Sequence, residues 1–158
     1  MTAADFPPPP ALVPMCRVRC RVEPIVTLGA APLGERRYVA LLGGPVDGPE
    51  LNGEVLPFGA DWQINRADGT LEIAAHYVIR TTDGALVEVH SDGLRHGPPE
   101  VLARLMRGEA VDPSAYFFRT IIRFTTGAPA WAHLNKTLAI ARGQRDQDAV
   151  LLHYYRIT

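Results

Sequence analysis

The stretch that decides the fold is residues 68–91, DGTLEIAAHYVIRTTDGALVEVHS. Asp-Gly pairs at 68–69 and 83–84 are typical of hairpin turns and bracket a run from 70 to 81. Every second residue inside that run is apolar: Leu71, Ile73, Ala75, Tyr77 and Ile79. Successive side chains of a strand point to opposite faces, so this alternation predicts a strand with one buried face. The second turn leads into another strand at 85–91.

The same period of two extends along most of the chain. Cys16, Val18, Cys20 and Val22 alternate with charged residues, which predicts a half-buried antiparallel strand at 16–23. Further strands are expected at 36–42, 54–57, 61–66, 116–126, 131–142 and 149–157. One short helix is expected to begin at Pro98-Pro99 and to end at Gly108, because proline is tolerated in a first turn.

These elements predict an all-β fold, a closed or nearly closed antiparallel β-barrel of about eight to ten strands with one short helix. The absence of an alternating helix–strand rhythm argues against a parallel nucleotide-binding sheet. Residues 15–158 are expected to form a single barrel domain, and residues 1–14, which include Pro7 to Pro10, a flexible proline-rich arm. A barrel of about eight strands has room for packed side chains or for one small ligand.

Composition excludes several classes of protein. The 158 residues are 47% apolar and 21% charged, which fits a globular protein and excludes wholesale disorder. The formal charge of −1 argues against nucleic acid as a partner, because phosphate neutralisation needs a basic excess. There is neither a leader-like segment nor an apolar run of about 20 residues, so we expect a cytoplasmic protein without a membrane partner.

The two cysteines are expected to be buried thiols. Four residues of a strand span about 13 Å at ~3.3 Å per residue. A disulfide needs Cα atoms less than about 7 Å apart, so Cys16 and Cys20 cannot be joined within one strand. Two thiols also fall short of a structural zinc site.

Asp61 is the first candidate for chemistry. It follows a segment with Gly53, Pro57 and Gly59, where a bulge or bend is expected. If Asp61 lies beside the aromatic wall of Trp62, burial raises its pKa and suits it to proton transfer. The alternative is that Asp61 caps a turn while Trp62 fills the core.

His133 is the second candidate, because it alternates with Trp131 and Asn135 in an expected strand. Either these three side chains line a cavity, or Leu134 and its neighbours point inward and His133 is exposed to water. Imidazole is the natural acid or base near neutral pH.

Two further segments offer groups that bind ligands. The alternating face that begins with Tyr116 and Phe118 is either core or the apolar wall of a pocket. Arg95 at a barrel mouth either holds a carboxylate or phenolate, or is a surface charge. The five histidines lie on separate segments without metal-ligand spacing, so we expect no metal and no cofactor, although a barrel can bring some of them together.

Four segments in order, GEVLPFGADW, HYVIRTTDGALVEVHSDGLR, YFFRTIIRFTTG and WAHLNKTLAIARG, resemble the bacterial domain-of-unknown-function family 3237, also catalogued as uncharacterised protein family 0311. The resemblance covers roughly residues 21–158 and implies a small barrel of lipocalin-like shape, often oligomeric, without an established reaction. The family's recurrent positions match here at Asp61, Trp62, Tyr77 and Arg95, among others.

Two departures from the family pattern stand out. Phe124-Thr125-Thr126 lacks a carboxylate that the family tends to carry, and His133 replaces an indole. We therefore expect His133 to be the new polar element of a specialised pocket.

The sequence therefore predicts a β-barrel that binds an apolar or aromatic small molecule and assembles as a homo-oligomer. One hypothesis is an isomerase, cyclase or hydro-lyase for an aromatic or polyketide-like molecule; the alternatives are a non-catalytic carrier or sensor and a structural subunit. The expected catalytic residues are Asp61 and His133. The expected substrate-binding residues are Trp62, Tyr77, Arg95, Tyr116, Phe118, Trp131 and Asn135.

Overall fold

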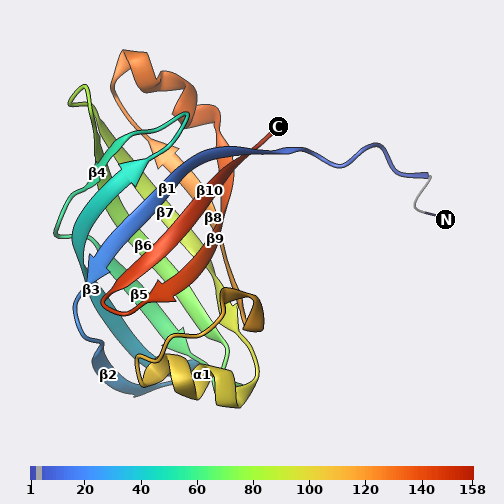
Figure 1. The fold of residues 1–158 in the computed structure, drawn as a ribbon, viewed down its shortest axis with the longest axis vertical. Coiled ribbons are helices and arrows are strands. Elements are labelled where there is room, and N and C mark those ends of the chain that lie inside the picture. Colours follow the sequence, from blue (N-terminus) through green and yellow to red (C-terminus); the bar gives the residue numbers. More distant parts are fainter. Residues whose placement is uncertain (3–4) are drawn as a thin grey trace.

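The computed structural model describes residues 1–2 and 5–158, and its main feature is an antiparallel β-barrel with helical segments at both ends (Figure 1). The strands are β1 (Leu12–Val22), β2 (Val26–Ala31), β3 (Gly34–Asp47), β4 (Gly53–Val55), β5 (Ala60–Asn65), β6 (Leu71–Thr81), β7 (Leu86–His96), β8 (Phe117–Thr125), β9 (Leu138–Asp146) and β10 (Ala149–Ile157). The helical segments are α1 (Pro99–Met106) and the 3₁₀ segments η2 (Pro113–Ala115) and η3 (Pro129–Lys136).

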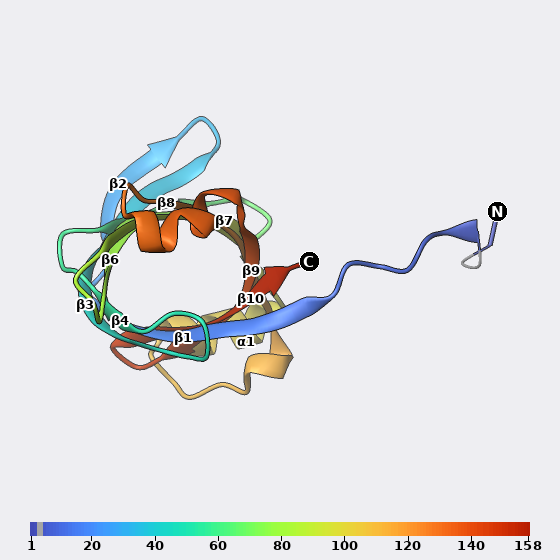
Figure 2. The ribbon, with the colours of Figure 1, turned by 90° about the horizontal axis from the view of Figure 1, so that it is seen from above.

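The barrel closes through β3, which pairs with β1 on one side and with β4 and β5 on the other. From β1 the order continues through β10, β9, β8, β7 and β6 to β4 and β5, which share one position in the wall. β2 pairs with β3 outside this ring (Figure 2). The predicted all-β closed barrel with one short α-helix is thereby confirmed.

The break between β4 and β5 is the bend that the glycines and Pro57 predicted. β4 ends at Val55 and β5 begins at Ala60, and Phe58 between them has a φ of 83°. A Cβ on Gly59 would lie 2.7 Å from the Cβ of Tyr77, so only glycine fits this close approach to β6.

The structure corrects the expected elements in two places. Residues 131–136 are not a strand: Pro129 starts the 3₁₀ segment η3, and β9 begins only at Leu138. β2 was not predicted. Its pattern is exposed at five of six positions, so it lacks the alternation that marks a buried face.

The N-terminal arm joins the barrel earlier than expected. The predicted boundary at residue 15 lies inside β1, because Leu12 already pairs with Ile157 of β10. Residues 5–11, ahead of β1, lead away from the barrel (Figure 1). Among the described residues, no helix has the length and apolar character needed to cross a membrane.

The interior toward η3, which we call the filled half, is solid apolar core. Its almost completely buried side chains are Met15, Val46, Leu51, Val55, Ile79, Val87, Val89, Ile122, Leu134 and Tyr154. Both cysteines are free and buried on the inner face of β1, as expected. Burial raises the pKa of Cys16 to about 12, so its thiol stays protonated at neutral pH.

Candidate functional site

The interior toward α1, which we call the hollow half, contains a cavity of about 100 Å³, named here the polar cavity. Its lining residues are Val22, Ile25, Val39, Leu41, Asp61, Gln63, Leu71, Ile73, Arg95, Leu105, Met106, Phe118, Arg145 and Val150. Helix α1 lies across this end of the barrel and contributes Leu105 and Met106 (Figure 1). These two apolar side chains of α1 therefore cover the cavity.

Asp61 faces the polar cavity because the polar residues of β5 point into the barrel and its aromatic residue points outward, the reverse of the usual arrangement. Asp61 and Gln63 point inward, whereas Trp62 between them is 41% exposed on the outer wall. Asp61 Oδ2 accepts a hydrogen bond from Gln63 Nε2 at 2.6 Å, and Oδ1 accepts one from the Ala74 amide at 3.2 Å. Burial raises the pKa of Asp61, although these hydrogen bonds and the nearby Arg95 and Arg37 oppose the rise.

Three arginines make this end of the barrel strongly cationic. Arg37 is only 4% exposed, and its Nε donates to Gln63 Oε1 at 3.0 Å, so a hydrogen-bonded chain runs from Arg37 through Gln63 to Asp61. Arg95 and Arg145 line the cavity directly. Burial and the neighbouring Arg37 and Arg145 lower the pKa of Arg95 to about 10, which still leaves it charged at neutral pH.

The charge of the Arg95 guanidinium has no direct partner among the described side chains. Within residues 1–2 and 5–158 it has neither an ion pair nor a side-chain hydrogen bond, although its pKa is influenced by Asp61. A half-buried cation without a partner is costly unless a ligand or water satisfies it. The cavity is therefore suited to receive an anionic or strongly polar oxygen.

A second cavity, of about 50 Å³ and named here the apolar cavity, lies deeper in the barrel and shares Asp61 and Phe118 with the first. Tyr77 lines it, and the Tyr77 hydroxyl is hydrogen-bonded to that of Tyr154. Burial raises the pKa of Tyr77, so its hydroxyl remains protonated. The two cavities therefore adjoin, and together they offer charged groups toward α1 and apolar walls deeper in the barrel.

Phe118 is held in place between the cavities by Gly143. A Cβ on Gly143 would lie 2.7 Å from three atoms of the Phe118 ring. The ring therefore packs directly on the backbone of β9, where any larger residue would displace it.

A surface groove of about 260 Å³ beside α1, named here the α1 groove, leads toward the polar cavity. The groove shares Leu71, Arg95 and Met106 with that cavity. Its other lining residues are Arg37, Asn65, Gly69, Pro99, Leu102 and Ala103. Arg95 therefore lines both the surface groove and the interior cavity.

Four of the predicted site residues come together in the hollow half: Asp61, Tyr77, Arg95 and Phe118. Tyr116 is buried as expected for its face, but its hydroxyl accepts a hydrogen bond from the Arg145 backbone N–H at 3.0 Å. Its part is to fix β9 beside the cavity.

The expectation that Trp62 forms a wall beside Asp61 is wrong. Neighbouring residues of a strand point to opposite faces, so Asp61 and Trp62 cannot line the same cavity. Trp62 packs outside against Tyr38, with ring centroids 5.2 Å apart, and Arg36 lies over its ring.

The expected grouping of Trp131, His133 and Asn135 on one strand face is also wrong. All three lie on η3 at the opposite end of the barrel (the orange coil at the top of Figure 1), and His133 is exposed. Trp131 donates through Nε1 to the Asp83 carboxylate. Asn135 bonds to the backbone N–H and C=O of Thr126. These contacts hold η3 against the barrel, and none of the three side chains lies in the cavity with Asp61.

Sequence reasoning missed Arg37, Gln63 and Arg145 as parts of the site. The signal was present in the period of two. Arg37 alternates with Val39 and Leu41, which face inward, and Gln63 alternates with Asp61.

The fold and the cavities define a small closed β-barrel with a cationic internal cavity at one end. The chain belongs to the family described as protein of unknown function (DUF3237), whose model matches residues 10–157. This confirms the resemblance drawn from the four sequence segments.

Named relatives agree with that assignment. UPF0311 protein RPA1785 of Rhodopseudomonas palustris is 40% identical over 140 residues, which cover 89% of this chain and 92% of the relative. Its crystal structure has a TM-score of 0.92 at 38% identity, covering 96% of this chain and 100% of that one. An enzyme from Penicillium herquei has a TM-score of 0.73 at 23% identity, covering 97% and 98%, and shares the fold.

Proposed function

We propose that the hollow half binds a small aromatic or polyketide-like molecule through an anionic or enolisable oxygen, and that Asp61 transfers a proton on it. The reaction class is that of an isomerase, cyclase or hydro-lyase. The observation that carries this proposal is that Asp61 and the unpartnered Arg95 line one internal cavity.

The charge of the site supports the binding of an anionic or enolisable oxygen of the ligand. Arg95 and Arg145 face the cavity with Asp61 as the one acidic side chain among its lining residues. An arginine binds carboxylate or enolate oxygen through paired N–H donors, and its charge is less screened away from bulk water.

The volumes and apolar walls of the two cavities suit a ligand with one aromatic ring. The polar and apolar cavities measure about 100 and 50 Å³. An engineered apolar cavity of about 150 Å³ is known to hold a benzene molecule. Phe118, Ile73 and Val150 supply apolar walls to both cavities. A longer substrate would leave its remainder in the α1 groove.

Proton transfer follows from the position of Asp61. Its carboxylate takes a proton from the carbon beside a carbonyl group, and the C–H electron pair moves into a new C=C bond. The carbonyl π electrons pass to oxygen, where Arg95 stabilises the negative charge. Asp61 then returns the proton to the oxygen or to another carbon, so atoms and electrons balance without an oxidant.

The hydrogen bonds that Asp61 accepts support its role in proton transfer. Gln63 and the Ala74 amide hold both carboxylate oxygens, which fixes the direction in which the group faces. A raised pKa moves a carboxyl group toward the range in which it exchanges protons efficiently. The Penicillium herquei protein of the same fold is described as an enzyme, which favours catalysis over a purely carrying role.

Phenylpyruvate is a suitable probe, because it combines one ring, a carboxylate and an enolisable carbon. The experiment follows its keto–enol conversion by absorbance and its binding by calorimetry. Asp61→Asn should abolish the protein-dependent rate with little change in affinity, while Arg95→Met should weaken binding. Asp47→Asn and Arg17→Met, which alter an exposed ion pair on the outer wall, are matched controls.

Each outcome of this experiment decides something. Equal rates in the wild-type protein and in Asp61→Asn would refute the proton-transfer role. Binding that needs Arg95 but gives no turnover in the wild type would support the carrier alternative. Binding that ignores Arg95→Met would refute the site itself.

Assembly as a homo-oligomer is a separate proposal. The structural-subunit alternative requires the proline-rich arm to join subunits. Because β1 begins at Leu12, the matched deletion is residues 1–11, which leaves the barrel wall intact. Light scattering should show a smaller mass after this deletion; an unchanged mass would contradict a role for the arm.

A further inference from the structure

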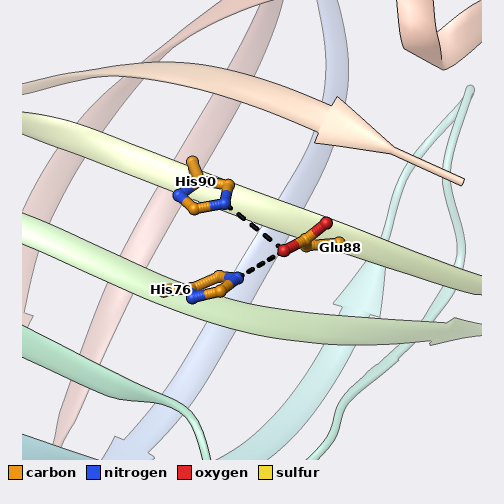
Figure 3. A group of neighbouring side chains, drawn as sticks. All are labelled: His76, Glu88 and His90. Atoms are coloured by element: carbon orange, nitrogen blue, oxygen red, sulfur yellow. Dashed lines mark hydrogen bonds and ion pairs between the residues drawn. The ribbon is translucent and has the colours of Figure 1, made fainter.

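A cluster outside the hollow half places two histidines and a glutamate on the outer wall (Figure 3). His76 of β6 and His90 of β7 are directly opposed across the strand pair. Their rings stack with centroids 4.0 Å apart and planes inclined by 21°. Both side chains are about half exposed, so the cluster is open to solvent.

Glu88 connects the two imidazoles. Its Oε1 lies 2.7 Å from His76 Nε2 and 3.4 Å from His90 Nε2. Figure 3 shows both nitrogens converging on this one oxygen. The three possible ligand atoms all lie within 4.8 Å of one another, so a single ion can reach all of them after small side-chain rotations.

We propose that His76, Glu88 and His90 form a binding site for one divalent transition-metal ion, with zinc as its representative. Two imidazole nitrogens and one carboxylate oxygen are a ligand set that holds zinc with a fourth position open to water. The same set also suits copper and nickel, because imidazole binds each of these ions well.

The backbone makes the site well prepared for an ion. Neighbouring strands of a closed sheet fix the separation of the opposed histidines, and Glu88 is two residues from His90 on the same face. Few backbone changes are therefore needed when an ion binds between the two imidazoles and Glu88.

The surroundings leave room for the ion and its water. Ala60 of β5 stands opposite His76, and Ala74 precedes His76 by two residues on the same outer face. The charged neighbours of His90 are Arg123, opposite it on β8, Asp92 on β7, and Lys136 of η3, which lines a surface pocket together with these residues. The two carboxylates, Asp92 and Glu88, match the two cations, Arg123 and Lys136, in number, so the surroundings carry no net positive charge.

The site is separate from the proposed reaction. His76 lies between Ala75 and Tyr77, whose side chains face the apolar cavity on the inner side of the wall. An ion on the outer face would join β6 to β7 and stabilise the folded barrel.

The experiment titrates Zn²⁺ into the full chain, freed of any affinity tag, and follows heat by calorimetry. We expect one ion per chain with micromolar or tighter affinity. His76→Ala and His90→Ala should each weaken binding by about tenfold or more, and Glu88→Gln by less. His96→Ala and His133→Ala, which remove exposed histidines elsewhere, should leave binding unchanged.

A spectroscopic measurement separates this site from other histidines. Bound Cu²⁺ should give electron paramagnetic resonance couplings from two imidazole nitrogens in the wild type and from one in each single histidine variant. The absence of saturable zinc binding, or equal binding in His76→Ala, His90→Ala and the wild type, would overturn the proposal. Circular dichroism confirms that the variants fold.

Discussion

The filled and hollow halves of this barrel are built on the same eight strand positions but differ in what points inward. Toward η3 the inner positions are aliphatic, as at Ile79 of β6 and Ile122 of β8. Toward α1 the same kind of position carries Arg95 on β7 and Asp61 on β5. The comparison teaches that close apolar packing and buried polar groups are separated along the barrel axis.

The energetics of the two halves differ accordingly. Close packing of aliphatic side chains contributes dispersion and hydrophobic energy in the filled half. In the hollow half, burial of charged groups opposes folding, and hydrogen bonds such as that from Arg37 to Gln63 offset only part of the cost. A ligand that satisfies Arg95 would recover more of it.

The largest difference between the halves should appear on truncation of one isoleucine in each. Ile122→Ala removes a fully buried side chain from close packing, so we expect a loss of about 4 kcal/mol in the free energy of unfolding. Ile73→Ala enlarges two existing cavities, and we expect about 2 kcal/mol. Urea titrations measure both values, and equal losses would remove the distinction between the halves.

Removing the unpartnered charge of Arg95 in the hollow half should weaken ligand binding without lowering stability. Arg95→Met deletes a charge-assisted contact with a bound anion, so affinity for phenylpyruvate should fall about tenfold to a hundredfold. Because the variant also removes a half-buried charge, its unfolding free energy should not fall. Calorimetry and urea unfolding test the two statements separately; a parallel loss of stability would mean that Arg95 is mainly structural.

Adding a methyl group next to the Phe118 ring should change both the stability of the hollow half and its ligand affinity. The new methyl group in Gly143→Ala would push the Phe118 ring toward the cavities. We expect about 1–3 kcal/mol of destabilisation together with weaker phenylpyruvate binding. Gly127→Ala is the control, since a Cβ there meets no atom within 4 Å. Unchanged binding in Gly143→Ala would show that Phe118 does not limit the cavity.

The smallest expected effect is the pH dependence that Asp61 gives to stability. Its pKa is raised in the folded state, so the folded protein holds this proton more strongly than the unfolded chain does. Its contribution to stability is complete below the unfolded value of about 3.9 and is lost as pH rises through the folded pKa. The difference between wild-type and Asp61→Asn unfolding curves across pH isolates it. A difference independent of pH would contradict the raised pKa.

Alternation predicted the wall of the barrel well wherever the inner face is apolar. The inner faces of β1, β6 and β8 were assigned correctly from residues such as Val18, Tyr77 and Phe118. It failed for η3, where the Trp131–Asn135 spacing is compatible with a strand. There Pro129 and the burial of Leu134 alone favour a tight 3₁₀ turn.

The site was predicted only in part, because its residues invert the usual pattern. On β5 the polar Asp61 and Gln63 face inward while Trp62 faces water, so a rule that places aromatic residues inside misassigns the tryptophan. The histidine pair was missed for another reason. His76 and His90 lie at equal distances along the chain from Asp83, and only the hairpin register places them opposite each other.

The most direct test of the central claim is a crystal structure of the protein with phenylpyruvate bound. The account predicts the ligand in the polar cavity, with an oxygen on the Arg95 guanidinium and its enolisable carbon within reach of the Asp61 carboxylate. A ligand bound elsewhere while the cavity stays filled by water or side chains, under conditions that saturate binding in solution, would contradict it.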